Sequence, residues 1–428
     1  MEAPPVKVGV LGCGNVGGAL VQLLLGDADG IARRTGLRLQ VARVAVRNVA
    51  RERAVDLPEG CLTHDAEAVV NDPDIDVVVE VIGGIEPARS LILQALKAGK
   101  PVVTGNKELL ANVGSELFEA AATAGVDLLY EASVAGGIPL IRPLRESLAG
   151  ERILRVMGIV NGTTNFILTK MTEEGASYAD ALAEAQSLGF AERDPTADVE
   201  GFDAGAKAAI IASIAFGVKV VAGDVYREGI SGITAADIAF AGRLGYVVKL
   251  LAIAEQLDGQ VAVRVHPAMI PATHPLAAVR ESFNAVFIEG EAVGELMLYG
   301  RGAGGMPTAS AVLGDLIDAA HNLRAGGAGR TAPLGRADLR PIDELSSQYY
   351  LDLMVDDRPG VLAAVAGVFG EHGVSIRSME QEGLGAEARL VFITHTARER
   401  DMQATISGLR QLPAVERIGS LLRVVGPE

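Results

Sequence analysis

Lys207 is the residue of this sequence best suited to proton transfer. Asp203 lies four residues before it, so the two share one face of a predicted helix. The rest of that helix, Ala208–Phe216, is almost entirely apolar, which predicts burial on most sides. A buried lysine is uncommon unless it is paired or functional, and its surroundings tune its pKa for acid–base work. We favour a general acid over the alternative, an exposed ion pair.

An acidic segment precedes this helix. It contains Glu192, Asp194, Asp198 and Glu200. A run of charges is usually a solvated loop, which is one interpretation here. The other is that acids crowded before a buried lysine bind a cationic group, such as the ammonium of an amino acid.

The segment Gly12-Cys13-Gly14-Asn15-Val16-Gly17 has the GxGxxG spacing and follows a predicted strand directly. The first two glycines permit a tight turn and a close approach of the backbone to a ligand. The helix that begins here offers free N–H groups to a pyrophosphate. We therefore predict dinucleotide binding by Gly12, Gly14, Asn15, Val16 and Gly17. Cys13 is either a reactive thiol or an inert one filling space behind the loop.

Arg47 bears on the choice of cofactor. It ends the second predicted strand, where a site for NAD would place Asp or Glu to hold the ribose hydroxyl. An arginine suits a phosphate instead, through a charge-assisted contact. The sequence favours NADP over NAD, and a solvated basic patch is the alternative.

Thr104 and Lys107 follow another buried strand, at the sheet edge where ligands bind. Lys107 either contacts the cofactor or a substrate carbonyl, or is a surface lysine that starts the next helix. Gly83 and Gly302 complete the predicted cofactor site.

The composition excludes several classes of partner. The 428 residues are 49 % hydrophobic and 21 % charged, as in a globular protein with a full core. A formal net charge of −16 argues against nucleic acids and anionic membranes. Two cysteines and scattered histidines give no zinc pattern. Without a signal peptide or a long apolar run, the sequence predicts a cytoplasmic protein with no membrane partner.

Short apolar strands alternate with helices over the first 135 residues, which predicts a Rossmann-like doubly wound parallel sheet. The expected strands are Val6–Leu11, Leu39–Val46, Val77–Ile82, Pro101–Thr104 and Val126–Tyr130, and the expected helices are Val16–Leu25, Pro87–Ala98 and Glu108–Ala124.

The rest of the chain predicts two further domains. We assign residues 1–135 and 301–323 to the dinucleotide-binding domain and 136–300 to an inserted α+β catalytic and dimerisation domain. In the inserted domain the expected strands are Ile153–Val160, Val261–Val265, Ala285–Glu289 and Glu295–Tyr299, with helices at Tyr178–Leu188 and Asp203–Phe216; the helix Thr308–His321 returns to the first domain. Residues 324–347 form a Gly, Ala and Arg-rich linker, and residues 348–428 have a βαββαβ pattern.

These motifs resemble the homoserine dehydrogenase family over nearly all of residues 6–320. The resemblance rests on GCGNVGG, TGNKELL, YEASVAGGIPL, NGTTNFIL, GFAERDPTADVEGFDAGAK and GRGAGGMPTASAV, in this order. The C-terminal pattern, with Asp357-Arg358-Pro359-Gly360 after its first strand, resembles an ACT domain, an amino-acid-sensing module.

The resemblance implies reversible, NAD(P)-dependent reduction of L-aspartate 4-semialdehyde to L-homoserine, in threonine and methionine biosynthesis. It implies that Lys207 is the acid–base, assisted by Lys107, and that Glu192, Asp198, Asp203 and Thr163 bind the substrate, with Asp198 orienting Lys207. It also implies a monovalent cation, usually sodium, at Glu131, Val134, Gly136 and Ile138. The residues alone do not indicate that ion.

The ACT resemblance implies regulation of a homo-oligomer, a dimer or a tetramer, with threonine as the expected effector. Its expected site is the loop after the first strand of the domain, with Asp357, Arg358, Gly360 and Val361. A dimerisation module without a ligand is the alternative.

Two other functions remain open at this point. A 2-hydroxyacid dehydrogenase with an ACT domain would need a catalytic histidine, and none is evident. A non-catalytic amino-acid sensor would not need Lys207 in a buried helix.

Overall fold

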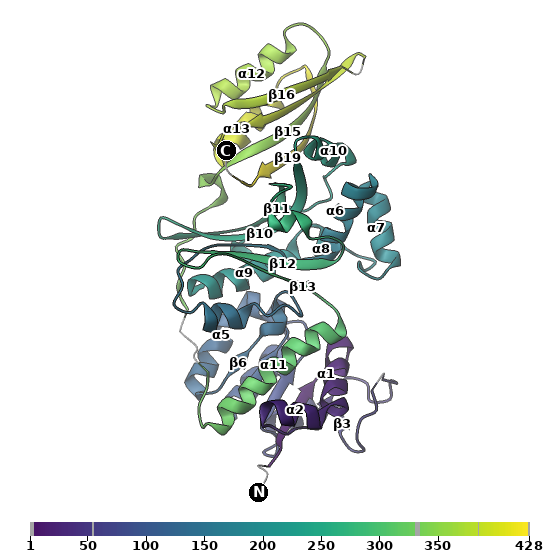
Figure 1. Cartoon of the computed structure of the whole chain (residues 1–428), viewed down its shortest axis with the longest axis vertical. Helices are drawn as coiled ribbons and strands as arrows, with labels where there is room; N and C mark the ends of the chain where they lie inside the picture. Colours follow the sequence, from purple (N-terminus) through teal and green to yellow (C-terminus); the bar gives the residue numbers. More distant parts are fainter. Residues whose placement is uncertain (1–3, 54, 330–333, 384, 427–428) are drawn as a thin grey trace. The chain divides into compact units, whose positions relative to one another are not determined.

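The computed structural model describes residues 4–53, 55–329, 334–383 and 385–426 (Figure 1). The chain divides into two compact units. Unit 1 comprises residues 1–156, 206–225 and 284–337, and unit 2 comprises residues 157–205, 226–283 and 338–428. Within the described ranges, no helix is both long and apolar enough to cross a membrane.

Unit 1 is built on six parallel strands in the order β3-β2-β1-β4-β5-β6. Their bounds are β1 Val6–Leu11, β2 Leu39–Ala45, β3 Leu62–Thr63, β4 Val77–Glu80, β5 Val102–Thr104 and β6 Leu128–Leu129. The order reverses beside β1, and this switch point is where doubly wound sheets bind their ligands. The predicted Rossmann-like parallel sheet is therefore confirmed.

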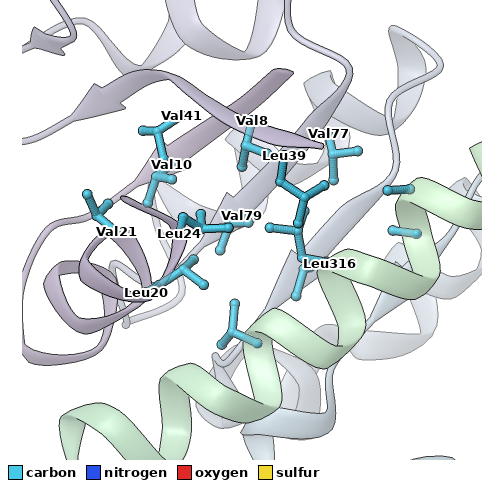
Figure 2. Close-up of a cluster of buried hydrophobic side chains, with 14 of the residues drawn as sticks. Val8, Val10, Leu20, Val21, Leu24, Leu39, Val41, Val77, Val79 and Leu316 are labelled. Atoms are coloured by element: carbon cyan, nitrogen blue, oxygen red, sulfur yellow. The ribbon is translucent and has the colours of Figure 1, made fainter. Parts of the chain in front are cut away.

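Helices α1 (Asn15–Gly26) and α11 (Gly305–Arg324) cover this sheet with apolar side chains. Figure 2 shows Leu20 and Leu24 of α1 and Leu316 of α11 facing Val10 and Val79 of the strands. Helix α11, near the predicted helix Thr308–His321, thus packs against the core of this sheet. The remaining helices of the sheet are α2 Ala28–Thr35, α3 Ala66–Asn71, α4 Ala88–Lys97 and α5 Lys107–Ala124.

Among the described residues, three elements pass along the chain from one unit to the other: strand β7 (Ile153–Ile159), helix α9 (Phe202–Phe216) and strand β12 (Phe283–Gly290). From Asn284 onward, β12 belongs to unit 1, where it pairs with β13 (Gly294–Arg301). In the predicted linker, Gly335–Arg336 forms β14, which pairs with β8 (Val218–Lys219). Residues 330–333 of that linker lie outside the described residues.

Unit 2 contains a long antiparallel hairpin of β10 (Tyr246–Leu257) and β11 (Gln260–Pro271). Strand β10 was not predicted from the sequence, and of β11 only Val261–Val265 was. An unbroken apolar run does not show whether it is strand or helix. Around the hairpin lie α6 Gly162–Glu174, α7 Tyr178–Ser187, α8 Thr196–Val199, β9 Tyr226–Arg227 and α10 Ala235–Arg243.

The C-terminal part of unit 2 has the predicted βαββαβ order. Its elements are β15 Ser346–Asp356, α12 Val361–Glu371, β16 Ile376–Gly383, β17 Glu387–Thr394, α13 Glu399–Leu409 and β19 Val415–Val424. The strand order is β19-β15-β17-β16, with a core that includes Tyr349, Val365, Phe369 and Phe392.

This C-terminal domain is not the separate module that the sequence predicted. Strand β19 pairs in parallel with β11 of the hairpin, with Arg423 beside Ala268 and Val424 beside Met269. One sheet therefore runs from the hairpin into the C-terminal domain. The contact joins segments about 150 residues apart, which periodicity along the chain cannot reveal.

Candidate active site

The GxGxxG turn has the geometry of a phosphate-binding loop. Gly12 has a left-handed backbone (φ +102°), and a Cβ there would lie 2.8 Å from the carbonyl oxygen of Val81. A Cβ on Gly17 would overlap the carbonyl oxygen of Gly12, whereas one on Gly14 would meet nothing within 4 Å. Helix α1 begins at Asn15 without a side-chain cap. Its first N–H groups are thus available to a pyrophosphate on the open side of Gly14.

A second glycine-rich loop, residues 302–305, closes against the first. A Cβ on Gly305 would lie 2.8 Å from the carbonyl oxygen of Asn15, and one on Gly136 would overlap the carbonyl oxygen of Gly302. The structure therefore brings together the predicted cofactor loop, Gly302, and the turn around Gly136.

Glu80, at the end of β4, is a site residue that the sequence analysis missed. Its carboxylate is fully buried and accepts hydrogen bonds from Thr104 Oγ1 at 2.6 Å, Ile82 N at 2.7 Å and Gly83 N at 3.2 Å. These bonds fix the loops that carry Thr104 and Gly83 at the carboxyl ends of β4 and β5. A glutamate within an all-valine strand was the available signal.

Asn106 positions Lys107. It caps α5 by accepting from Leu109 N at 3.1 Å, and it donates to the carbonyl oxygen of Gly84 at 2.7 Å. Lys107, half-buried, is the first residue of α5. Its backbone is thus held next to the Glu80 network.

Arg47 is exposed directly after β2, as expected for a residue that meets a ligand at the sheet edge. The arginine that organises this loop is Arg53, which donates to the carbonyl oxygen of Asn48 at 2.6 Å. Arg53 also contacts the thiol of Cys13. Burial raises the pKa of that thiol, and Arg53 partly opposes the rise. Cys13 is therefore protonated near neutral pH.

A cavity of about 340 Å³ lies beyond the end of β3, next to the start of α4. His64, Asp65, Pro87, Ser90 and Gln94 are among its lining residues. Because it opens at the carboxyl edge of the sheet, it is placed to receive part of an extended cofactor. The sequence analysis did not single out these residues.

Glu131 acts as a structural cap. Its buried carboxylate accepts N–H bonds from Leu140 at 2.5 Å, Ile141 at 2.7 Å and Arg142 at 2.8 Å. Its own N–H donates to Asp315, which also pairs with Arg142. Burial raises the pKa of Asp315 to about 7. Both carboxylate oxygens of Glu131 therefore accept backbone hydrogen bonds that stabilise the fold.

The other predicted cation ligands lie on a buried turn. Val134, Gly136 and Ile138 are buried, and Ala135 and Gly136 have φ values of 56° and 54°. Consecutive left-handed residues turn backbone groups away from regular pairing. Within the described ranges, no group of three or more His, Cys, Asp or Glu could hold a metal ion. Any ion here would depend on backbone carbonyls, which are oxygen ligands of the kind that hard cations prefer.

In unit 2, Asn161 gathers two of the predicted substrate residues. Its amide nitrogen donates to Asp198 Oδ1 at 2.6 Å and to Asp203 Oδ2 at 2.9 Å. Its amide oxygen accepts from Thr164 N at 2.9 Å and so caps helix α6. Asp203 is buried, whereas Asp198 is partly exposed. The result is a pair of carboxylates that can receive a cationic group.

The other predicted residues differ in their burial and in their contacts. Thr163 is buried and donates its hydroxyl to the carbonyl oxygen of Phe190 at 2.6 Å, which ties α6 to the acidic segment. Glu192 is exposed on that segment. Lys207, one turn after Asp203 on α9, is only 9 % exposed, so its predicted burial is confirmed.

Lys249 of β10 supports the same region and was missed. It is 2 % exposed and donates to Asn165 Oδ1 at 2.9 Å and to the carbonyl oxygen of Val279 at 2.5 Å. Burial lowers its pKa to about 8. Asn165 in turn donates to the carbonyl oxygen of Glu281 at 2.9 Å. These bonds fasten the first turns of α6.

The predicted effector residues line one cavity of about 340 Å³ in the C-terminal domain. Asp357, Arg358, Gly360 and Val361 meet Gln381 there. Gly360 is left-handed (φ +91°), and α12 begins after it without a side-chain cap. The cavity therefore combines free helix N–H groups with one arginine and several acidic oxygens, the groups that bind a free amino acid.

The Rossmann-like sheet, its phosphate-binding loop and the buried lysine together define a nicotinamide-dependent oxidoreductase. Family models agree: homoserine dehydrogenase, NAD binding domain, matches residues 12–131; homoserine dehydrogenase matches 139–317; and the ACT domain matches 349–414. The chain belongs to the homoserine dehydrogenase family, whose members are oxidoreductases that act on CH–OH groups.

Individual relatives match the chain over nearly its whole length. A homoserine dehydrogenase from Corynebacterium glutamicum is 51 % identical, over 98 % of this chain and 95 % of the relative. A structure from Thiobacillus denitrificans superposes with a TM-score of 0.93 at 43 % identity, covering 99 % of this chain and 98 % of the other. A hyperthermophilic archaeal homoserine dehydrogenase in complex with NADPH has a TM-score of 0.62 at 30 % identity, covering 74 % and 98 %.

Proposed function

We propose that this enzyme interconverts L-aspartate 4-semialdehyde and L-homoserine. The observation that carries the proposal is the pair of carboxylates held by the Asn161 amide, of which Asp203 lies one helical turn before the buried Lys207. Such a pair suits the ammonium of an amino-acid substrate, and a buried lysine suits proton exchange with the reacting oxygen.

When bound, a reduced nicotinamide would supply the hydride that the aldehyde carbon accepts. Lys207 gives its proton to the carbonyl oxygen, which becomes the hydroxyl of homoserine, and takes a proton back in the reverse direction. Lys107, at the start of α5, polarises the same oxygen. Asp203 and Glu192 hold the substrate, Asp198 orients Lys207, and Thr163 fixes the segment beside them.

NADP is the proposed cofactor. The support is the exposed Arg47 after β2, in a loop organised by Arg53. Gly12, Gly14, Asn15, Val16 and Gly17 would hold the pyrophosphate, with Thr104, Gly83 and Gly302 beside them. The relative crystallised with NADPH supports this choice for the family.

A sodium-like monovalent cation is a further proposal. Because both Glu131 oxygens accept backbone N–H groups, the carbonyls of Val134, Gly136 and Ile138 would supply the ligands and Glu131 the neighbouring charge. Activity that is the same in sodium, potassium and a large organic cation would contradict it.

The ACT cavity is proposed to bind threonine in a homo-oligomeric, cytoplasmic enzyme. Its support is the uncapped N-terminus of α12 next to Arg358. Removing residues 340–428 would not test this, because the loss of β19 would expose the edge of β11. The test is threonine inhibition of the full chain, with Arg358→Ala expected to lose it.

The decisive experiment follows the absorbance of reduced nicotinamide with aspartate semialdehyde, and in reverse with homoserine. Turnover with both, and none with simple 2-hydroxy acids, supports the proposal. Turnover with 2-hydroxy acids alone would favour the 2-hydroxyacid dehydrogenase.

A further inference from the structure

The outer edge of β11 is shared by strands from two parts of the chain. Tyr226–Arg227 of β9 pairs with Arg264–Val265, and Arg423–Val424 of β19 pairs with Ala268–Met269. Since β10 occupies the other edge of β11 and both partners run parallel to it, β9 and β19 lie end to end. One belongs to the ACT domain (Figure 1), and the other leads into the segment beside Asp198.

Arg423 of β19 forms ion pairs with the buried Glu399 and with the partly exposed Glu228, which directly follows β9. It is 1 % exposed and donates to both oxygens of Glu399, at 2.7 and 2.8 Å. It also donates to Glu228 Oε1 at 2.8 Å, and its guanidinium carbon lies 5.4 Å from the centre of the Tyr226 ring. The Tyr226 hydroxyl donates to the same Glu228 oxygen. Glu228 is therefore held by its side chain to the ACT domain.

The backbone that follows Glu228 lies directly against the 189–201 segment, which carries Asp198. Ile230 N donates to the carbonyl oxygen of Val199 at 2.8 Å. A Cβ on Gly229 would overlap that same oxygen, so no space separates the two segments. Asp198 directly precedes Val199 in the chain. A shift of Glu228 must therefore shift the backbone that carries Asp198.

The place where Arg423 of β19 contacts Glu399 and Glu228 is called the junction here. Strand β15 connects this junction with the ACT cavity. Its residue Tyr349 donates to Glu399 Oε2 at 3.0 Å, and its last residues, Val355 and Asp356, line the cavity. Of the three buried side-chain atoms that lack a hydrogen-bond partner among the described residues, Arg423 Nη1 and His266 Nε2 belong to β19 and β11. Because these two buried atoms lack hydrogen bonds within the described part of the chain, the present arrangement of Arg423 and His266 is destabilised. This reduces the difference in free energy between it and an alternative arrangement.

We propose that Glu228 is a positioning residue of the substrate site, and that its contact with Arg423 transmits the state of the ACT domain to the segment around Asp198. The inference rests on the proposed function only for the identity of the substrate. An effector in the ACT cavity acts through this contact when it binds one arrangement of the junction better than another.

The test compares Glu228→Gln with Glu255→Gln in the full chain. Glu228→Gln keeps the size of the side chain and removes the charge that Arg423 holds. Glu255 is the matched control, because it forms a largely buried ion pair with Arg264 of β11 at 2.5 Å and lies on β10, at the edge of β11 opposite to β9 and β19. The readouts are hydrogen exchange of the 189–201 segment and the KM for homoserine, alone and with threonine.

For Glu228→Gln we expect faster exchange in the 189–201 segment and a homoserine KM raised on the order of 2- to 30-fold, the range for residues that couple sites. The KM for NADP should not change. The threonine concentration for half inhibition should rise in Glu228→Gln and not in Glu255→Gln. Arg423→Lys, which keeps the charge but loses the planar fork, should give a smaller change in the same direction.

Glu228→Gln indistinguishable from Glu255→Gln in exchange and in KM would overturn the inference. Hydrogen exchange needs no turnover, so a wild-type enzyme inactive on homoserine would refute the proposed function and leave this comparison valid.

Discussion

Replacing Asn161 by Asp tests whether the Asn161 amide holds the carboxylates of Asp198 and Asp203 together. Aspartate still accepts from Thr164 N, so the cap of α6 is kept. It loses both donors, and a hydrogen bond to a charged group contributes about 1.5–3 kcal/mol. It also places a third carboxylate beside Asp198 and Asp203, where a like-charge pair at about 4 Å costs about 4 kcal/mol at an effective dielectric of about 20.

The cluster can relieve this repulsion by taking up a proton, which raises the pKa of one of its carboxyls. The folded variant then holds a proton that the unfolded chain has released, so its stability falls as pH rises through that window. We expect the two lost hydrogen bonds to cost about 3–6 kcal/mol at either pH, and the repulsion to add up to about 4 kcal/mol at pH 8 and clearly less near pH 5.

Urea unfolding followed by circular dichroism at both pH values measures the effect, and kcat/KM for homoserine should fall with it. Asn161→Ala is the control, because it loses the same donors and the cap without adding a titratable group. Its deficit should not change with pH. An Asn161→Asp deficit equal at pH 5 and pH 8 would show that the carboxylates do not face one another.

Four further changes test other parts of the enzyme. Lys207→Ala should lower turnover by about 10²–10⁴, the usual range for general acid–base catalysis, and near-normal turnover in a folded variant would remove Lys207 from the mechanism. Arg47→Asp should weaken NADPH far more than NADH, and equal weakening of both would make Arg47 structural. Asp315→Asn should abolish a fall in stability of about 4 kcal/mol between about pH 4 and pH 7, since burial raises the pKa of Asp315 from 3.8 to about 7; a slope retained in urea midpoints would contradict this. A bulky alkyl group on Cys13 should lower NADP affinity, and NADP should protect the thiol in a labelling time course; alkylated protein with normal affinity would refute this.

The sequence predicted the parts of this fold that depend on local patterning. Apolar strands such as Val6–Leu11 and the glycines of the first turn are specified by residues close together in the chain. The position of Lys207 on a buried helix followed from the same periodicity. Local pattern was therefore enough for the parallel sheet and for the C-terminal βαββαβ order.

The features that sequence reasoning missed arise from contacts between distant segments. Glu80 connects loops that follow two different strands, and Asn161 gathers carboxylates 37 and 42 residues away. The buried position of Lys249 was not predicted, because its strand, β10, was not expected from the sequence. Glu131 was given a role as a ligand by resemblance, while the fold uses its carboxylate to bind three backbone N–H groups. None of these roles can be read from spacing.

The place of β19 has a consequence for how the protein is made. Of the described strands it is the last to be synthesised, yet it lies between β11 and β15 in the sheet. Until the ribosome has released it, both of those strands expose an unpaired edge to other nascent chains. Newly made protein should therefore depend on chaperones until β19 has emerged from the ribosome, and ribosomes stalled before residue 415 should yield chains that aggregate.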